Sequence, residues 1–201
     1  KSPVVIGDSA DLKSSAKRIM FGKTLNAGQI CLAPDYVIIH KDKKEEFIAE
    51  AENAIKGFYP DIKDNEDYTS IINERHYNRI NSLIEDAKEK GANVHQINPS
   101  NEDFTQQEFY KIPPTIITNT SDDMRVMNEE IFGPVLPVLE YENIDDALST
   151  INAKDRPLGL YYFGTDKKEE SEIINKTSSG GVTVNNVIGH IQQTDLPFGG
   201  V

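Results

Sequence analysis

The residue best suited to covalent chemistry is Cys31, the one cysteine of the chain, in the segment Asn-Ala-Gly-Gln-Ile-Cys-Leu-Ala-Pro. A thiolate is a strong nucleophile near neutral pH, and a thioester formed on it passes its acyl group readily to water. Gly28 precedes the cysteine and permits a turn that a side chain would block. Backbone N–H groups around such a loop tip would stabilise both the thiolate and an oxyanion formed on attack at a carbonyl. The alternative is that Cys31 is a small buried apolar residue, as most free cysteines are.

A second hypothesis pairs the same thiol with a histidine. Cys31, His190 and either Asn185 or Asn186 would make a set that is chemically adequate for acyl transfer. In that case His190 is the base and the asparagine orients its ring. A third hypothesis is a non-catalytic interaction module, in which Cys31 serves only as a packing residue.

Other chemistries lack their sequence motifs. The chain contains no G-x-G-x-x-G, no G-x-x-x-x-G-K-[ST], no H-E-x-x-H, no EF-hand spacing and no G-x-S-x-G. Its four histidines lie far apart without the spacing of metal ligands, and a single cysteine excludes an internal disulfide and a four-cysteine zinc site. We therefore predict no metal site.

Strand and helix patterns alternate along the chain that must position these residues. Cys31 falls between a helix expected from residue 12 to residue 20 and a strand expected over residues 35–40. The other expected strands cover residues 4–6, 93–97, 115–117, 135–139, 160–163 and 181–184, and the other expected helices cover residues 43–57, 80–91, 145–152 and 170–176. This alternation predicts an α/β fold, a mostly parallel sheet flanked by helices, in one domain over residues 1–201. In open sheets of this kind ligands bind at the carboxyl ends of the strands, so we look for the site there.

Composition narrows the class of protein. The chain has 201 residues, with 33 acidic against 21 basic side chains and a formal net charge of −12. A surface this negative repels phosphate backbones and anionic lipids, so we expect neither nucleic acid nor a membrane surface as a partner. No apolar run is long enough to span a bilayer, and one unpaired thiol suits the reducing cytoplasm.

Four segments resemble, in order, signature motifs of the aldehyde dehydrogenase superfamily. They are residues 1–6 (KSPVVI), 26–37 (NAGQICLAPDYV), 128–135 (NEEIFGPV) and 196–201 (LPFGGV). The resemblance covers essentially the whole chain. Ala-Pro-Asp-Tyr after the cysteine, together with Asp-Leu-Pro-Phe-Gly-Gly near the last residue, is most similar to the class 3 branch, which holds enzymes for fatty and aromatic aldehydes.

The resemblance implies a role for each matching residue. Cys31 would add to the aldehyde carbon, and the resulting thiohemiacetal would become a thioester after hydride transfer to NAD or NADP. Glu130 would bind the nicotinamide ribose, Phe132 would pack beside the nicotinamide, and Phe198 would line the substrate and domain-interface region. The expected substrate is a small-molecule aldehyde, coniferyl aldehyde or another aromatic or fatty aldehyde.

The same resemblance assigns parts of the enzyme to sequence beyond this chain. The family's general base, a glutamate, would lie just before Lys1, and its side-chain oxyanion donor and cofactor-binding half would lie further upstream. The segment that helps subunits pair would follow Val201. We therefore expect the chain by itself not to turn over aldehyde, and the parent protein to be a cytoplasmic homodimer.

Overall fold

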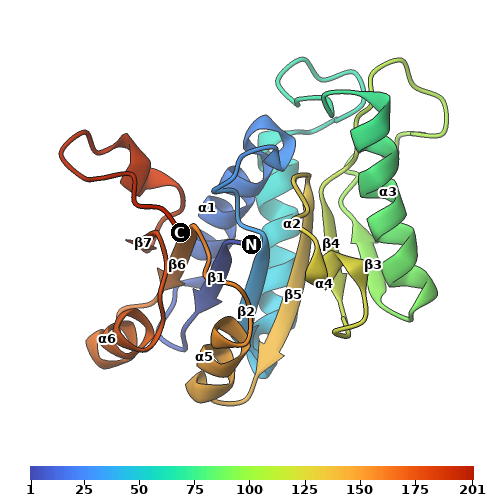
Figure 1. The fold of residues 1–201 in the computed structure, drawn as a ribbon. Coiled ribbons are helices and arrows are strands. Elements are labelled where there is room, and N and C mark those ends of the chain that lie inside the picture. Colours follow the sequence, from blue (N-terminus) through green and yellow to red (C-terminus); the bar gives the residue numbers. More distant parts are fainter.

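Seven short strands form one sheet in the computed structural model, which describes residues 1–201, and the central strands are mostly apolar (Figure 1). The strands are β1 (Pro3–Ile6), β2 (Tyr36–His40), β3 (Asn93–Gln96), β4 (Thr115–Thr118), β5 (Val135–Tyr141), β6 (Gly159–Phe163) and β7 (Gly181–Val184). Their order across the sheet is β3-β4-β5-β2-β1-β6-β7, and every neighbouring pair is parallel except β3 with β4. The predicted α/β fold with a mostly parallel sheet is confirmed.

Polar side chains cap four of the six helices. The helices are α1 (Leu12–Thr24), α2 (Lys44–Phe58), α3 (Glu74–Glu89), α4 (Arg125–Asn128), α5 (Ile144–Asn152) and α6 (Lys167–Lys176), with single 3₁₀ turns η1 (Leu25–Gly28), η2 (Lys41–Lys43) and η3 (Gly189–Gln192). Asp11, Asn73, Asn143 and Asp166 accept hydrogen bonds from first-turn N–H groups of α1, α3, α5 and α6. The cap at Asp166 starts α6 three residues before the start expected from its apolar residues, and the one-turn helix α4 was not predicted.

Successive side chains of a strand pack into hydrophobic cores on opposite faces of the sheet. Val4 and Ile6 of β1 face α1 and α2, whereas Val5 between them faces α5 and α6. The third core, under α3 and α4, includes Ile117 of β4 and Val135 of β5. Both faces of the central strands are thus dry, which explains why these strands read as continuous apolar runs.

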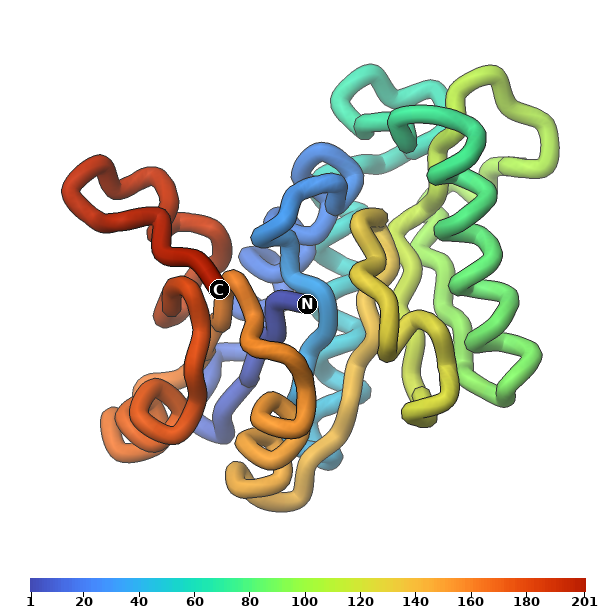
Figure 2. Tube along the Cα trace, in the orientation of Figure 1, coloured from blue at the N-terminus to red at the C-terminus, as the bar shows by residue number.

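The candidate site lies at the amino ends of the parallel strands, so the prediction of a site at their carboxyl ends is wrong. Residues 1–2 precede β1, Cys31 precedes β2, and residues 129–134 precede β5. The physical reason is connectivity: α1 leaves the carboxyl end of β1 and carries the chain back to the amino edge, where the segment with Cys31 then enters β2 (Figure 2). Each of these segments is a loop that feeds into a strand.

Candidate active site

Cys31 lies in an exposed turn between α1 and β2. Before it, three consecutive residues have left-handed backbone, with φ of 52° at Asn26, 52° at Ala27 and 72° at Gly28. A left-handed alanine is unfavourable by itself, so the surrounding structure must hold this segment in place. The chain reverses direction here and presents the thiol to the outside.

Gln29 fixes this turn to the long loop that follows α2. Its Oε1 accepts a hydrogen bond from Ile72 N at 2.9 Å, and its Nε2 donates to Ser70 O at 3.1 Å. The same Nε2 also donates to Asn26 O at 3.0 Å. A single amide side chain therefore joins the Cys31 segment to a part of the chain that is distant in sequence.

The backbone around the thiol keeps its donors free. The N–H groups of Ile30, Cys31 and Leu32 donate no hydrogen bond within the chain. The carbonyl of Leu32, by contrast, accepts a 2.6 Å hydrogen bond from the buried Tyr161 hydroxyl. The turn is thus held by its carbonyl side and leaves N–H groups that can donate to a thiolate or to an oxyanion, in agreement with the expected loop tip.

Cys31, Glu130 and Phe132 line one narrow pocket. The cavity volume is about 10 Å³, roughly the room that one water molecule needs. Phe132 has a left-handed backbone, with φ of 49°, and its side chain is 40% exposed. Although about a hundred residues separate the cysteine from the other two, the fold brings these three sequence-predicted residues together.

The two loops of the pocket are in backbone contact at Gly28. A Cβ at that position would lie 2.4 Å from Gly133 O and 2.9 Å from Lys23 O. Only a residue without a side chain allows this approach, which sets the distance between the Cys31 segment and the Glu130 loop.

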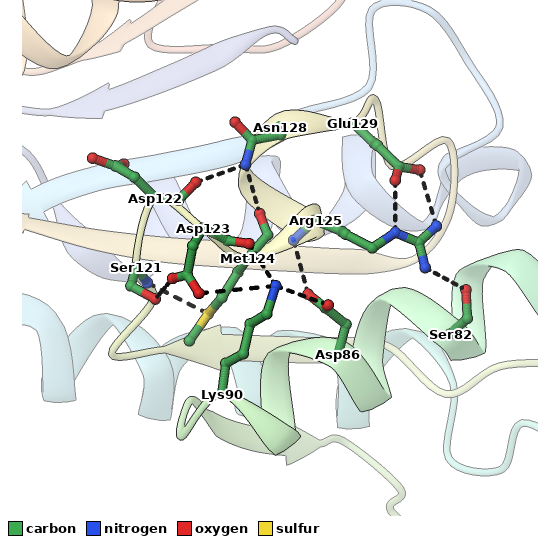
Figure 3. Close-up of polar contacts among 10 residues, drawn as sticks. All are labelled: Ser82, Asp86, Lys90, Ser121, Asp122, Asp123, Met124, Arg125, Asn128 and Glu129. Atoms are coloured by element: carbon green, nitrogen blue, oxygen red, sulfur yellow. Dashed lines mark hydrogen bonds and ion pairs between the residues drawn. The ribbon is translucent and has the colours of Figure 1, made fainter.

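Helix α4 carries the Glu130 loop and is anchored to α3 by charged side chains (Figure 3). The Asp86 carboxylate accepts a 2.8 Å hydrogen bond from Arg125 N at the start of α4, and this bond is the main reason why the pKa of Asp86 is lowered. Lys90 lies 3.0 Å from the same carboxylate. At the end of the turn, the Arg125 guanidinium contacts Glu129, with Nε 2.7 Å from Oε1. A single turn of helix could not persist alone, so these contacts stabilise it.

The residues of the pocket fit a nicotinamide cofactor. Glu130 is exposed, and its carboxylate makes no hydrogen bond or ion pair within the chain. A free carboxylate can accept hydrogen bonds from the two hydroxyls of a ribose. The exposed ring of Phe132 offers a flat apolar surface beside it.

Lys23 is a pocket residue that the sequence analysis missed. Burial lowers its pKa to about 8, although the Asp35 and Glu130 carboxylates oppose that shift. A signal was available, because Lys23 follows Ala16, Ile19 and Met20 at helical spacing and so occupies the apolar stripe of α1. Ser2 and Asp35 also line the pocket and were likewise missed.

The arrangement proposed for a cysteine, histidine and asparagine set does not form. His190 Nδ1 lies 2.8 Å from Thr183 Oγ1, and its Nε2 is buried without a hydrogen-bond partner. Asn185 binds Gly164 through both its side-chain oxygen and nitrogen, and the Asn186 oxygen accepts from the N–H of the next residue. Neither asparagine orients the ring, whose pKa is lowered by burial.

Phe198 stays outside the Cys31 pocket, with 51% of its surface exposed. The glycines after it pack on the start of β7, since a Cβ on Gly199 would overlap Gly180 O. The structure gathers no three His, Cys, Asp or Glu side chains that could hold a metal ion. None of the helices combines the length and apolar composition needed to cross a bilayer.

Comparison with known proteins gives one family. The family described as "Aldehyde dehydrogenase family" matches residues 1–201. The chain is 55% identical over 201 residues to the probable coniferyl aldehyde dehydrogenase of Caulobacter vibrioides, covering 100% of this chain and 41% of that protein. Among solved structures, the substrate-bound Staphylococcus aureus AldH has a TM-score of 0.91 and 36% identity, over 100% of this chain and 42% of that one. The NADP-dependent glyceraldehyde-3-phosphate dehydrogenase from Bacillus halodurans C-125, complexed with NADP, has a TM-score of 0.80 and 28% identity, over 93% of this chain and 38% of that one.

Proposed function

Because this chain belongs to the aldehyde dehydrogenase family, we propose that it is the catalytic domain of an enzyme that oxidises an aldehyde to the carboxylic acid. The observation that carries the proposal is the pocket shared by Cys31, Glu130 and Phe132. A nucleophile, a free carboxylate and an exposed aromatic ring meet there at the amino edge of the sheet. That combination suits an aldehyde and a nicotinamide cofactor held side by side.

The chemistry of this chain centres on Cys31. Its Sγ attacks the carbonyl carbon of the aldehyde, and the carbonyl oxygen becomes an oxyanion. The unpaired N–H of Cys31 can donate to that oxyanion, together with the neighbouring amides of the turn. NAD or NADP, when bound, would accept the hydride from the substrate. Glu130 would hold the ribose of that cofactor, and Phe132 would pack beside its nicotinamide ring. The acyl group then remains on Sγ as a thioester, which water cleaves to the acid and the free thiol.

Other parts of the whole enzyme must complete this reaction. The chain spans about two fifths of the length of the relatives it matches, 41% for the protein from Caulobacter vibrioides. We assign the general base, the side-chain oxyanion donor and the rest of the cofactor site to that remainder. The isolated chain should accordingly bind no aldehyde productively.

The substrate we favour is an aromatic aldehyde of the coniferyl type. Support comes from the name of the relative at 55% identity, a probable coniferyl aldehyde dehydrogenase. A long-chain aldehyde is the second choice, because the class 3 branch includes fatty aldehyde enzymes.

The setting of the whole enzyme follows from the same reasoning. A nucleophilic thiol must stay reduced, which favours the cytoplasm. We also propose a homodimer, the usual state of the class 3 branch, and static light scattering on the full-length enzyme would test it.

The test is turnover by the full-length enzyme that contains this chain. Coniferyl aldehyde and NAD or NADP should give the absorbance of the reduced cofactor, and Cys31→Ala should abolish it while its circular dichroism spectrum stays unchanged. A matched control is an exposed residue outside the pocket, Ser171→Ala. Absence of reduced cofactor from folded enzyme, across aromatic and fatty aldehydes with both cofactors, would refute the proposal.

A further inference from the structure

Three charged side chains hold the backbone on either side of Glu130. Lys1 Nζ donates to Glu129 O at 2.6 Å, and that carbonyl belongs to the peptide group preceding Glu130. Asp35 Oδ1 accepts from Ile131 N at 3.4 Å, in the peptide group that follows it. Arg79 donates to the Glu130 carbonyl itself at 3.3 Å. The Glu130 carboxylate has no partner in the chain, so its position depends on these backbone contacts.

Lys1 and Asp35 form a buried ion pair between the segments that precede the neighbouring strands β1 and β2. Lys1 Nζ lies 3.2 Å from Asp35 Oδ2, and the two side chains are only 11% and 5% exposed. Their backbones are joined as well, because Asp35 N donates to Ser2 O at 2.9 Å just before β1 and β2 pair. The pair thus lies where the neighbouring strands β1 and β2 begin, whereas the Glu130 loop precedes β5.

Lys1 also stabilises the end of α4. It donates to Val126 O at 3.0 Å in addition to Glu129 O, so an ammonium group meets carbonyls at the negative end of the helix. These carbonyls have no partners within the four-residue helix, and a buried unpaired carbonyl is unfavourable. Without Lys1, the end of α4 would lose both hydrogen bonds that join it to the segment before β1.

We propose that Lys1 and Asp35 are positioning residues for the cofactor. Their ion pair holds the peptide groups on either side of Glu130 and so orients the Glu130 carboxylate toward the ribose. The inference rests on the proposed function, since it assigns Glu130 to the cofactor. Neither residue reaches the reacting atoms. The expected signature is therefore weaker binding of the cofactor, with a chemical step that is nearly as fast.

The experiment uses the full-length enzyme with Lys1→Met, Lys1→Arg, Asp35→Asn and the double variant Lys1→Met/Asp35→Asn. A matched control is the exposed ion pair of Lys41 and Glu142, 2.7 Å apart, changed to Lys41→Met/Glu142→Gln. The measurements are KM for the oxidised cofactor, kcat with an aldehyde, Kd for the reduced cofactor by fluorescence titration, and Tm. These separate binding from chemistry and both from folding.

Each single neutralising variant should raise KM and Kd for the cofactor about tenfold or more, the effect of losing a charge-assisted hydrogen bond, while kcat changes much less. It should also lower Tm, because it leaves one buried charge unpaired. The double variant removes both charges and should recover part of the Tm, since the carbonyls of Val126 and Glu129 still lack their donor, yet it should keep the raised KM and Kd. Lys1→Arg should restore cofactor binding, and the control pair should behave as wild type.

Two results would overturn the inference. One is a double variant whose KM returns to the wild-type value together with its Tm, which would make the pair purely structural. The other is a lowered Tm in the single variants with unchanged Kd for the cofactor. A wild-type enzyme that neither binds reduced cofactor nor oxidises aldehydes would instead refute the proposed function, and that result is read before any variant is compared.

Discussion

The contact between Gly28 and Gly133 predicts that Gly28→Ala destabilises the chain strongly. A methyl group would lie 2.4 Å from Gly133 O and 2.8 Å from Gly133 C, and these are backbone atoms that cannot rotate away. The φ of 72° at Gly28 adds the cost of left-handed backbone in a residue with a Cβ, about 1–2 kcal/mol. Overpacking a close contact costs about 1–3 kcal/mol. Together the free energy of unfolding should fall by about 2–5 kcal/mol.

Thermal unfolding followed by circular dichroism measures this loss. For a chain of 201 residues, each kcal/mol lowers Tm by about 2–4 °C, so Gly28→Ala should lower it by at least about 4 °C. The matched control is Gly57→Ala inside α2, where a Cβ would meet nothing within 4 Å. That variant should gain roughly 0.5–1 kcal/mol from higher helix propensity. A Gly28→Ala chain within about 0.5 kcal/mol of wild type would refute the reasoning, because neither the backbone clash nor the left-handed φ could then be real.

Three further predictions concern side chains around the same edge of the sheet. Tyr161→Phe removes the donor to the buried Leu32 carbonyl and should cost about 1–3 kcal/mol in urea unfolding, whereas Tyr110→Phe, 38% exposed, should be neutral. The pKa of Lys23 is lowered from 10.5 to about 8, so the folded state releases this proton at a lower pH than the unfolded state does. The free energy of unfolding of the wild type should therefore rise above pH 8, by up to about 1.4 kcal/mol per pH unit. Lys23→Met should lack this rise, which urea titrations on either side of pH 8 would measure. The hydrogen bond from the first amide of α4 holds the pKa of Asp86 below 3.8, so the Asp86 carboxylate stabilises the fold above that pH. The difference in Tm between wild type and Asp86→Asn should therefore shrink as the pH falls below 3.8. A difference that stays constant with pH would contradict this prediction.

The strands and long helices were predictable because their signals are local. β-branched and aromatic residues run together in β2, and α2 repeats apolar residues at Phe47, Ala51 and Ile55. Helix α4 escaped prediction since its four residues are too few for any periodicity, and contacts from residues distant in sequence, Asp86 of α3 and Lys1, stabilise it. Local pattern therefore determines which segments form elements when those elements are long.

The sequence predicted which residues form the site better than it predicted where in the fold the site lies. The motifs around Cys31 and Glu130 pointed to both residues, and the structure places them in one pocket. Whether the pocket lies at the amino or the carboxyl ends of the strands depends on how α1 carries the chain from the end of β1 back to the start of β2. No local sequence pattern encodes this. The left-handed backbone at Phe132 is likewise a product of tertiary packing, whereas the burial of Lys23 had a local signal in its position on the apolar stripe of α1.

The wide sequence separation of the pocket residues has a consequence for biosynthesis. Strand β2 follows Cys31 closely, but β5, which pairs with β2 in parallel, comes after Glu130. Glu130 lies 99 residues after Cys31 in the chain. At a translation rate of roughly 5–20 residues per second, the thiol leaves the ribosome about 5–20 s before the loop that will face it exists. During that interval the Cys31 side chain, which is exposed in the folded structure too, has no Glu130 loop beside it. The order of the strands thus leaves the proposed nucleophile without its pocket during this interval.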